Sequence, residues 1–377
     1  MLKKCRIIKI ASVILAVSLL FSGCCNGQRL SDLTIVQAVG IDKKDENTQI
    51  SLQYLNLSKS TGSTESLSEN ITSVAYGTSN SISAAISTAS KVLSQRVFFG
   101  QNKLVIFGSK YAQNNLTKGL DYLVRSVDSR PDVLVAISED KASDVISCCE
   151  NDTMLPANKI YELLKLGEET GLGASVTVNH MLNMYSEITS DIYLPVLSLN
   201  NKIVKCKGIA VFSQEKYKKT LTPFQSFGML FINGNIKNGS LNVNNDALGN
   251  IGVEILSSKS KRSAYVSNGQ LHFDIRIKLR IMLDEIERGT TTSVQHPETK
   301  TIESLVSEKV RRMCMSSVKE CFSLGSDPFM MGKYLARDSE KQYNALKNNW
   351  RELLPYTSVS IKVTADLEKV NDNSVRQ

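Results

Sequence analysis

A run of alternating apolar and polar residues near the end of the chain constrains the fold more than any other segment. Apolar side chains occupy every second position from Leu271 to Leu283, and charged or polar ones fill the positions between Leu271 and Ile281. Successive side chains of a β-strand point to opposite faces, so the pattern predicts a long strand with one buried and one solvated face. Antiparallel sheets commonly keep one face in water, and we therefore predict an antiparallel sheet covered on one side.

The first half of the chain alternates between strand and helix signals. Apolar runs predict strands at residues 33–41, 49–56, 103–107 and 132–137, and a further apolar stretch covers 193–199. Helical spacing predicts helices at residues 80–95, with Asn80 as N-cap, and at 110–126, 142–146, 158–170 and 177–189. Residues 58–73 hold nine Ser or Thr among 16 and predict a surface loop. Strands that alternate with helices indicate a sheet with covering helices.

The second half holds signals of antiparallel pairing. Three Asn-Gly pairs predict hairpin turns, because glycine accepts a positive φ at little cost: Asn233-Gly234, Asn238-Gly239 and Asn268-Gly269. Strands are predicted at residues 208–212 and 358–367, the latter closing the sheet, and amphipathic helices at 302–321 and 343–353.

These elements predict an α+β, multi-domain fold with mixed or antiparallel sheets flanked by helices, because a chain of 377 residues is too long for one simple core. We predict a signal peptide at residues 1–23, an α/β region of one or two subdomains at 24–205, an α+β domain at 206–370 and a polar tail at 371–377.

The N-terminus carries the pattern of a secretory signal. Four basic residues, Lys3, Lys4, Arg6 and Lys9, precede 12 residues at 10–21 that are mostly apolar, too few to span a bilayer. Small residues then precede Cys24, an order that resembles a bacterial lipobox with cleavage after Gly23. Cys24 is therefore the predicted lipid anchor, with an N-palmitoyl and an S-diacylglycerol group. An ordinary signal peptide, or modification of Cys25, is the alternative.

Composition excludes several classes of function. Loss of the signal lowers the formal charge from +8 to +4, which predicts a solvated surface, with attraction to anionic lipid as a weaker alternative. No basic run is dense enough to predict binding to nucleic acid. The chain has no C-x-x-C and no histidine at ligand spacing from a cysteine, so we predict no metal site and mostly free thiols, and leave a disulfide open.

Catalytic patterns are absent from the sequence. The three histidines, His180, His272 and His296, are scattered, and no G-x-S-x-G occurs. Gly171-Leu172-Gly173 lacks the third glycine of a dinucleotide loop, and the acids Asp284, Glu285 and Glu287 indicate a solvated strand end. We therefore predict no enzyme, no catalytic residue and no cofactor.

Several short motifs, taken in order, resemble one family. They are Gly23-Cys24, residues 30–42, 103–108, 119–130 and 208–212, Ser326-Asp327-Pro328, and Trp350 to Pro355. Together they resemble the C-subunit lipoproteins of the Ger-type spore germinant receptors, the Ger(x)C or GerAC-like family. The chain departs from the family's pattern just after the anchor, where Cys25-Asn26 and Gln28-Arg29 stand in place of Trp-Asp and Arg-Glu.

The resemblance implies mixed α/β portions arranged around sheets. It also implies a lipid-anchored location at the outer face of the spore inner membrane and assembly with two integral membrane subunits. The function it implies is a non-catalytic part in nutrient-triggered germination, and direct contact with a small-molecule ligand stays open. The alternatives are a lipid-anchored cell-wall hydrolase or its regulator, and a solute-binding lipoprotein.

The lipobox generates a direct test. Cys24→Ala removes the thiol that receives the diacylglycerol, so the protein should leave the membrane fraction or stay unprocessed, because two acyl chains are what hold a domain stably on a bilayer. Mass analysis of the mature N-terminus identifies the modified residue. A lipid on Cys25, or a mature chain without lipid, would contradict the prediction.

Overall fold

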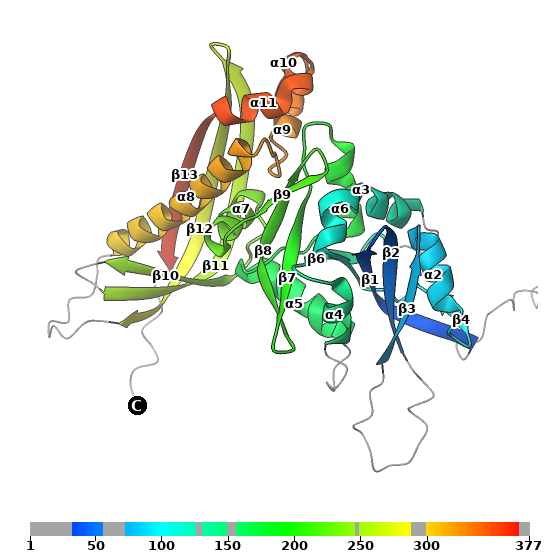
Figure 1. The fold of residues 1–377 in the computed structure, drawn as a ribbon. Coiled ribbons are helices and arrows are strands. Elements are labelled where there is room, and N and C mark those ends of the chain that lie inside the picture. Colours follow the sequence, from blue (N-terminus) through cyan, green and yellow to red (C-terminus); the bar gives the residue numbers. More distant parts are fainter. Residues whose placement is uncertain are drawn as a thin grey trace, which may run out of the picture.

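The computed structural model describes residues 32–55, 72–125, 130–148, 156–245, 249–287 and 299–368, which form two β-sheets (Figure 1). The strands of the first sheet are β1 (Leu33–Lys44), β2 (Asn47–Leu55), β3 (Thr72–Ser79), β4 (Arg96–Phe98), β5 (Leu104–Gly108), β6 (Leu134–Ser138), β7 (Tyr193–Asn200), β8 (Ile203–Ser213) and β9 (Lys216–Thr220). Their order is β3-β2-β1-β5-β6-β7-β8-β9, with β4 paired to β1. Strands β1, β5, β6 and β7 are parallel, and the strands on either side of them are antiparallel.

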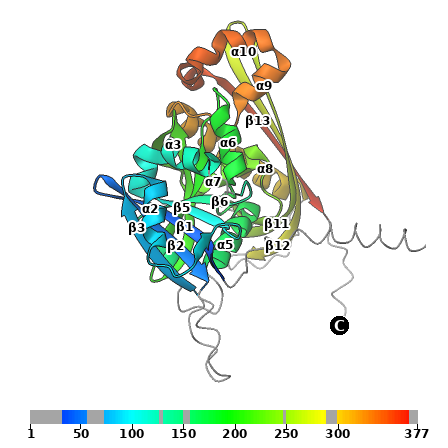
Figure 2. The ribbon, with the colours of Figure 1, turned by 90° about the vertical axis from the view of Figure 1, so that its right-hand side faces the viewer.

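Helices cover both faces of the first sheet (Figure 2). They are α2 (Ile82–Ser90), α3 (Ser109–Arg125), α4 (Ala142–Ser147), α5 (Pro156–Thr170) and α6 (Val178–Ser186). Val105 of β5 belongs to the apolar cluster with α2, α3 and α6, whereas its neighbour Leu104 belongs to the cluster with α4 and α5. A parallel strand buried on both faces reads as a continuous apolar run, and β5 and β6 have that pattern in the sequence.

The second sheet contains the alternating segment. Its strands are β10 (Gly239–Asn245), β11 (Gly249–Ser267), β12 (Gln270–Glu287) and β13 (Ser358–Glu368), in that order. Ile275 and Ile277 are buried beneath the long helix α8 (Thr299–Ser323), while Arg276 and Lys278 are exposed on the other face. The predicted division into a buried and a wet face is confirmed.

Helix α7 (Pro223–Asn233) connects the two sheets, since it packs on β8, β11 and α8. A capping box of Thr222 and Gln225 begins it, and Gly234 ends it in a left-handed conformation with φ 77°. Gly228 lies where α7 crosses α8, and a Cβ there would come within 2.2 Å of the Met313 carbonyl oxygen. Glycine is therefore what allows the two helices to approach.

Three sequence expectations were wrong in a way that the packing explains. Asn233-Gly234 ends α7 and Asn238-Gly239 leads into β10, so only Asn268-Gly269, with φ 51° and 74°, forms the predicted hairpin turn. Strand β13 pairs with β12 in parallel, because the chain returns through α8 and three short helices, a crossover long enough for parallel pairing.

Other differences concern where elements begin and break. The N-cap of α2 is Ser81 rather than Asn80. The predicted helix at 343–353 is broken into α10 (Glu340–Leu346), a 3₁₀ turn at Lys347–Asn349 and α11 (Trp350–Leu353). Sequence reasoning missed α7, α9 (Met331–Asp338) and the strands β3, β4 and β9.

The observed fold class is the predicted one, α and β elements arranged around two mixed sheets. The boundary at residue 205 stays a prediction; β8 runs through this position and pairs with β7. The predicted signal, the polar tail and most of the 58–73 loop lie outside the described residues. Within the described part of the chain, no helix is long and apolar enough to cross a membrane.

Two neighbours on β12 test the assignment of the faces. Ile277→Ala removes buried volume beneath α8 and should lower the free energy of unfolding by about 2–5 kcal/mol, since the cavity adds to the lost burial. Lys278→Ala, its exposed neighbour, is the matched control and should change stability little. Denaturant unfolding of both variants is the measurement, and equal losses, or a larger loss for Lys278→Ala, would contradict the assignment of the faces.

Candidate functional site

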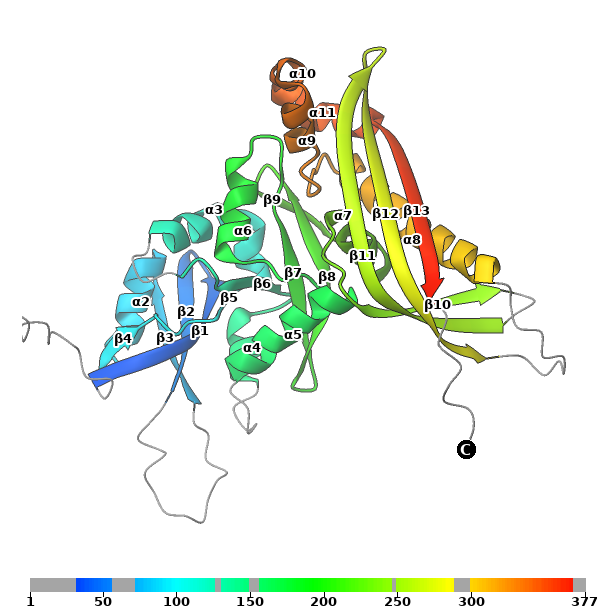
Figure 3. The same cartoon turned by 180° about the vertical axis from the view of Figure 1, so that it is seen from behind.

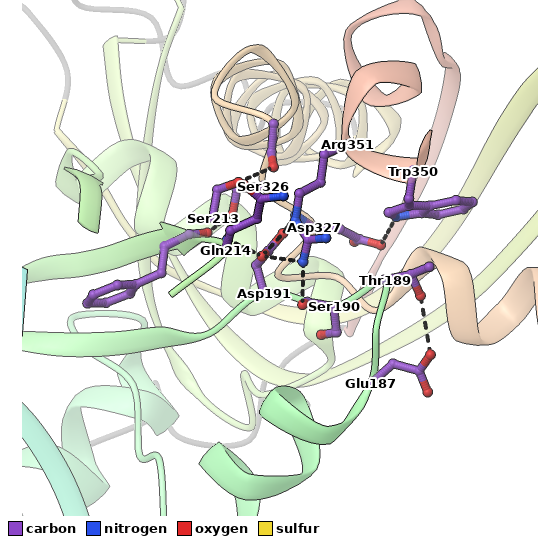
Figure 4. Close-up of polar contacts among 12 residues, drawn as sticks. Glu187, Thr189, Ser190, Asp191, Ser213, Gln214, Ser326, Asp327, Trp350 and Arg351 are labelled. Atoms are coloured by element: carbon purple, nitrogen blue, oxygen red, sulfur yellow. Dashed lines mark hydrogen bonds and ion pairs between the residues drawn. The ribbon is translucent and has the colours of Figure 1, made fainter. Parts of the chain in front are cut away.

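The most elaborate polar cluster among the described residues surrounds Asp327, in the loop that follows α8 (Figure 4). Its carboxylate accepts hydrogen bonds from the backbone N–H of Phe329, Met331 and Gly332 at 3.1–3.3 Å, and from the indole Nε1 of Trp350 at 3.1 Å. Two of these donors, Met331 and Gly332, are the first residues of α9, where orphan N–H groups favour an anion. Asp327 therefore fixes the beginning of α9 and the position of the buried Trp350 together.

Asp191, which stands just before β7, joins this cluster to the first sheet. One carboxylate oxygen accepts the Asp327 N–H at 3.0 Å, and the Asp191 N–H donates to the Asp327 carbonyl at 3.1 Å. The other oxygen accepts the Gln214 N–H at 3.0 Å and two guanidinium donors of Arg351 at 2.9 and 3.2 Å. The Asp191 side chain is 2% exposed and that of Arg351 is 23% exposed, so this ion pair is largely removed from water.

Serine hydroxyls complete the junction between the two halves. Ser213 donates to the Gly325 carbonyl at 2.6 Å, and Ser326 donates to the Phe212 carbonyl at 2.5 Å. Gly332 lies so close to Thr189 that a Cβ would come within 2.0 Å of its hydroxyl oxygen. The loop at 325–332 is thereby held in one position against the start of β7 and the end of β8.

Burial raises the pKa of Asp327 to about 7, against the opposing effect of the hydrogen bonds from Met331 and Trp350. A carboxyl group with a strongly raised pKa is a candidate for proton transfer when it lies in a cleft. Asp327 is fully buried, and both of its oxygens already accept hydrogen bonds. Its geometry serves to hold structure, and no substrate can reach it in this conformation.

A pocket of about 670 Å³ lies at the carboxyl ends of β5 and β6. Its wall combines the first residues of α3 with β8 and β9, and it holds the ion pair of Lys207 and Glu139. Crevices at this edge of an α/β sheet are frequent binding places. The pocket offers charges of both signs and several hydroxyls, including those of Ser109 and Thr222. It can accommodate a small polar molecule and has no histidine or cysteine in its wall.

The structure keeps the sequence candidates for chemistry apart. His180 is largely buried on α6, packs edge-on against Tyr193, and has its pKa lowered by burial, whereas His272 stacks on Tyr265 on the second sheet. Asp284 and Glu285 are exposed at a strand end, as predicted. No group of three or more metal-ligating side chains occurs within the described ranges.

Of the described cysteines, Cys206, Cys314 and Cys321 are free thiols, and the Cys148 thiol donates a hydrogen bond to the Val145 carbonyl. Burial raises the pKa of Cys206 to about 11 and also raises the pKa values of Cys314 and Cys321. Gly23, Cys24, Cys25, Cys149 and His296 lie outside the described residues, so the lipid anchor stays a prediction.

Residues that carried the sequence resemblance prove to hold the fold together. Asp327 and Trp350 come from two separate motifs, and the structure brings them into direct contact. Asp42, from a third motif, accepts the N–H groups of Ala142 and Ser143 at 2.8 and 2.9 Å and so caps α4 from a distant strand. Asp191 was missed, because a single aspartate before an apolar run carries no local signal of a long-range partner.

Comparison with known proteins finds matches to spore germination proteins along nearly the whole chain. Residues 26–199 match the family model "Spore germination protein N-terminal domain", and residues 207–371 match "Spore germination B3/ GerAC like, C-terminal". The chain is 22% identical to spore germination protein KC of Bacillus subtilis, with 96% of this chain and 95% of the relative covered. It is 21% identical to spore germination protein GerQC of Bacillus cereus, with 96% and 98% covered.

A solved structure shares the fold. The crystal structure of the GerBC protein superimposes with a TM-score of 0.59 at 18% identity and covers 88% of this chain and 97% of that one. The agreement extends over both sheets, so the arrangement of α and β elements described above is the fold of that protein as well.

Arg351 provides the test of the junction. Arg351→Ala leaves the Asp191 carboxylate buried without its cation and should cost about 3–5 kcal/mol of stability. Arg337→Ala removes an arginine that pairs with Asp338 on the surface, and it should have little effect. Arg351→Lys keeps the charge and loses the two-donor geometry, so it should fall between the two. Denaturant unfolding of the three variants decides, and similar stabilities for Arg351→Ala and Arg337→Ala would contradict the assigned role.

Proposed function

The chain belongs to the GerAC-like family of spore germination proteins, and on this premise we propose that it acts as the lipid-anchored, non-catalytic C subunit of a spore germinant receptor. The observation that carries the proposal is the match of both halves of the chain, in order, to the two models of that family. The relatives that it matches are named as spore germination proteins, and each match covers almost the full length of the relative.

The geometry supports a binding or scaffolding role. Catalysis by side chains needs a nucleophile or base and an orienting group within hydrogen-bond reach in an open site. In the described part of the chain, the strongest polar cluster is buried and its acceptors are engaged in structural hydrogen bonds. A cell-wall hydrolase would need paired acids or a metal centre in a cleft, and the pocket beside β5 and β6 contains one acid, Glu139, paired with Lys207.

The anchor completes the proposed picture. Cys24, acylated after cleavage behind Gly23, would tether the folded chain to the outer face of the spore inner membrane. Two integral membrane subunits would be its partners there. The tether confines the domain to the bilayer surface and raises its effective concentration near those partners, as a short linker does.

Deletion of the gene in the spore-former is the test of this function. Germination with one or a few nutrients should be lost, because the receptor would lack one subunit. Sporulation, wall composition and germination by agents that bypass receptors should stay normal. The tagged protein should co-purify with two membrane proteins, and complementation with the unchanged gene is the control.

Two results would overturn the proposal. One is a deletion strain that germinates normally with every nutrient tested. The other is a purified chain that cleaves peptidoglycan, which would establish the hydrolase in its place. A Cys24→Ala variant that stays at the membrane and supports germination would remove the anchor from the proposal and leave the receptor role standing.

A further inference from the structure

The uncovered face of the second sheet carries an unusual concentration of positive charge. Six exposed cations lie on this face, contributed by three neighbouring strands: Lys259, Lys261, Arg276, Lys278, Arg280 and Lys362. Figure 3 shows this face toward the viewer, with α7 and α8 behind the strands. The alternation of the Leu271 to Leu283 segment shows three of these cations on one face of one strand, and pairing with β11 and β13 adds Lys259, Lys261 and Lys362 to the same surface.

The register places these cations directly opposite one another. Lys261 pairs with Arg276, which pairs in turn with Lys362, so one row across the sheet consists of three cations. In the next row Lys259 lies opposite Lys278. Side chains directly opposite on one face of a sheet have Cβ atoms about 5 Å apart, and like charges at that distance are destabilising. The chain therefore keeps an arrangement that weakens its own fold.

Five of these six cations also lack the carboxylate partner that several cations elsewhere in the molecule have. Arg280 pairs with Glu368, but the other five contact no described carboxylate within ion-pair distance. On other surfaces Arg125, Arg130, Lys219 and Arg311 all pair with a nearby acid. The acids of this face, among them Asp274, Asp366 and Glu368, lie toward its two ends, so an excess of positive charge remains on its middle rows. Such a surface is complementary to an extended anionic one.

We propose that this basic face, Lys259, Lys261, Arg276, Lys278, Arg280 and Lys362, binds the anionic phospholipid headgroups of a bilayer surface. A lysine stem is long enough to lie along the sheet and present its ammonium to a headgroup plane. Each lysine or arginine near an anionic leaflet strengthens binding roughly fivefold. The rows are about 7 Å apart along the strands, so the cations can engage several headgroups at once.

Two exposed tyrosines at one end of the second sheet also suit contact with a bilayer surface. Tyr265 is 41% exposed and stacks on His272 in the row that ends at Ser358, and Tyr356, just before β13, is 77% exposed. The Tyr356 carbonyl accepts a hydrogen bond from Gln270 at the β11–β12 turn, which places both tyrosines at this end of the sheet. Tyrosine is enriched where protein meets the headgroup region, because its ring is apolar and its hydroxyl is wet.

The proposed tether is compatible with this orientation, and this step rests on the proposed function. Eight residues, 25–32, separate the acylated cysteine from β1. A chain of this length spans at most about 30 Å, so β1 must begin near the membrane. Figure 3 shows β1 and the uncovered side of β11, β12 and β13 from the same direction, at the two sides of the molecule.

A bilayer fits this surface better than an acidic protein does. Lysine is depleted from the cores of protein–protein interfaces, where its charge would have to lose water. Four of the six cations are lysines, and they occupy the middle of the face with their charges in solvent. A bilayer surface leaves headgroups and ammonium groups hydrated, so it tolerates this arrangement.

Vesicle binding tests the proposal with a chain of residues 24–377 that carries Cys24→Ser. This chain keeps every described element and has neither signal nor lipid, so its binding does not depend on the anchor. It should bind vesicles that contain phosphatidylglycerol together with phosphatidylcholine, and not vesicles of phosphatidylcholine alone. Raising the salt from about 0.1 to about 1 M shortens the screening length from about 10 to about 3 Å and should release it.

Two triple variants of equal charge separate the face from net charge. Lys261→Gln, Lys278→Gln and Lys362→Gln together should weaken binding on the order of 100-fold, from about fivefold for each lysine. The control, Lys110→Gln, Lys118→Gln and Lys218→Gln, removes three exposed lysines from α3 and β9. Those lysines lie outside the face, so binding should change little. The face variant should melt no lower than the unchanged chain, because it relieves like-charge contacts.

Three results would overturn the inference. They are equal binding to both kinds of vesicle, equal losses for the two triple variants, and no binding to any vesicle at low salt. In the last case an acidic protein segment becomes the occupant to look for. A missing lipid on Cys24 would reject the anchor alone, because the vesicle experiment uses no lipid on the chain.

Discussion

The junction between the two sheets depends first on two buried carboxylates, those of Asp191 and Asp327. Asp191 stands just before β7, the last parallel strand of the first sheet. Asp327 lies in the loop that connects α8 to α9. The Asp191 N–H donates to the Asp327 carbonyl, and the Asp327 N–H donates to the Asp191 carboxylate. Each carboxylate then has its own partners, Arg351 for Asp191, and the N–H groups at the start of α9 with the Trp350 indole for Asp327. A buried charge is tolerated only with such partners, since an unpaired one costs several kcal/mol. The relative position of the two sheets is therefore specified by the hydrogen bonds and the ion pair of Asp191 and Asp327 as well as by apolar packing through α7.

This arrangement explains why the residues behind the family resemblance contribute to architecture. Asp42 caps α4 across the sheet, and Asp327 and Trp350 hold the loop against the last helices. None of them lines an open site with reactive neighbours. A subunit built in this way provides a rigid body with exposed surfaces. Its function then depends on where the body is held and on what its surfaces meet, and the basic face of the second sheet is the most strongly marked of them.

Much of the fold could be predicted from local pattern. Leu271 to Leu283 alternates so regularly that its two faces were assigned correctly, and the parallel strands β5 and β6 were found from short apolar runs between helices. Prediction failed where a local signal has two structural uses. Asn233-Gly234 ends a helix as readily as it turns a hairpin, because both require glycine at positive φ. The predicted 343–353 helix is broken at Lys347–Asn349, just before Trp350, whose indole donates to Asp327 from 23 positions away along the chain.

The sequence by itself determined the secondary structure periods, the apolar and wet faces, the family and the candidate anchor at Cys24, because each of these depends on neighbouring residues along the chain. Only the tertiary structure decided which distant residues meet. It paired Asp191 with Arg351 across 160 positions, and it laid Lys362 beside Arg276 in parallel register. The physical reason is that ion pairs and sheet registers are set by the three-dimensional packing of α7 and α8 between the sheets. The residues next to a charged side chain in the sequence do not identify the partner with which it will pair.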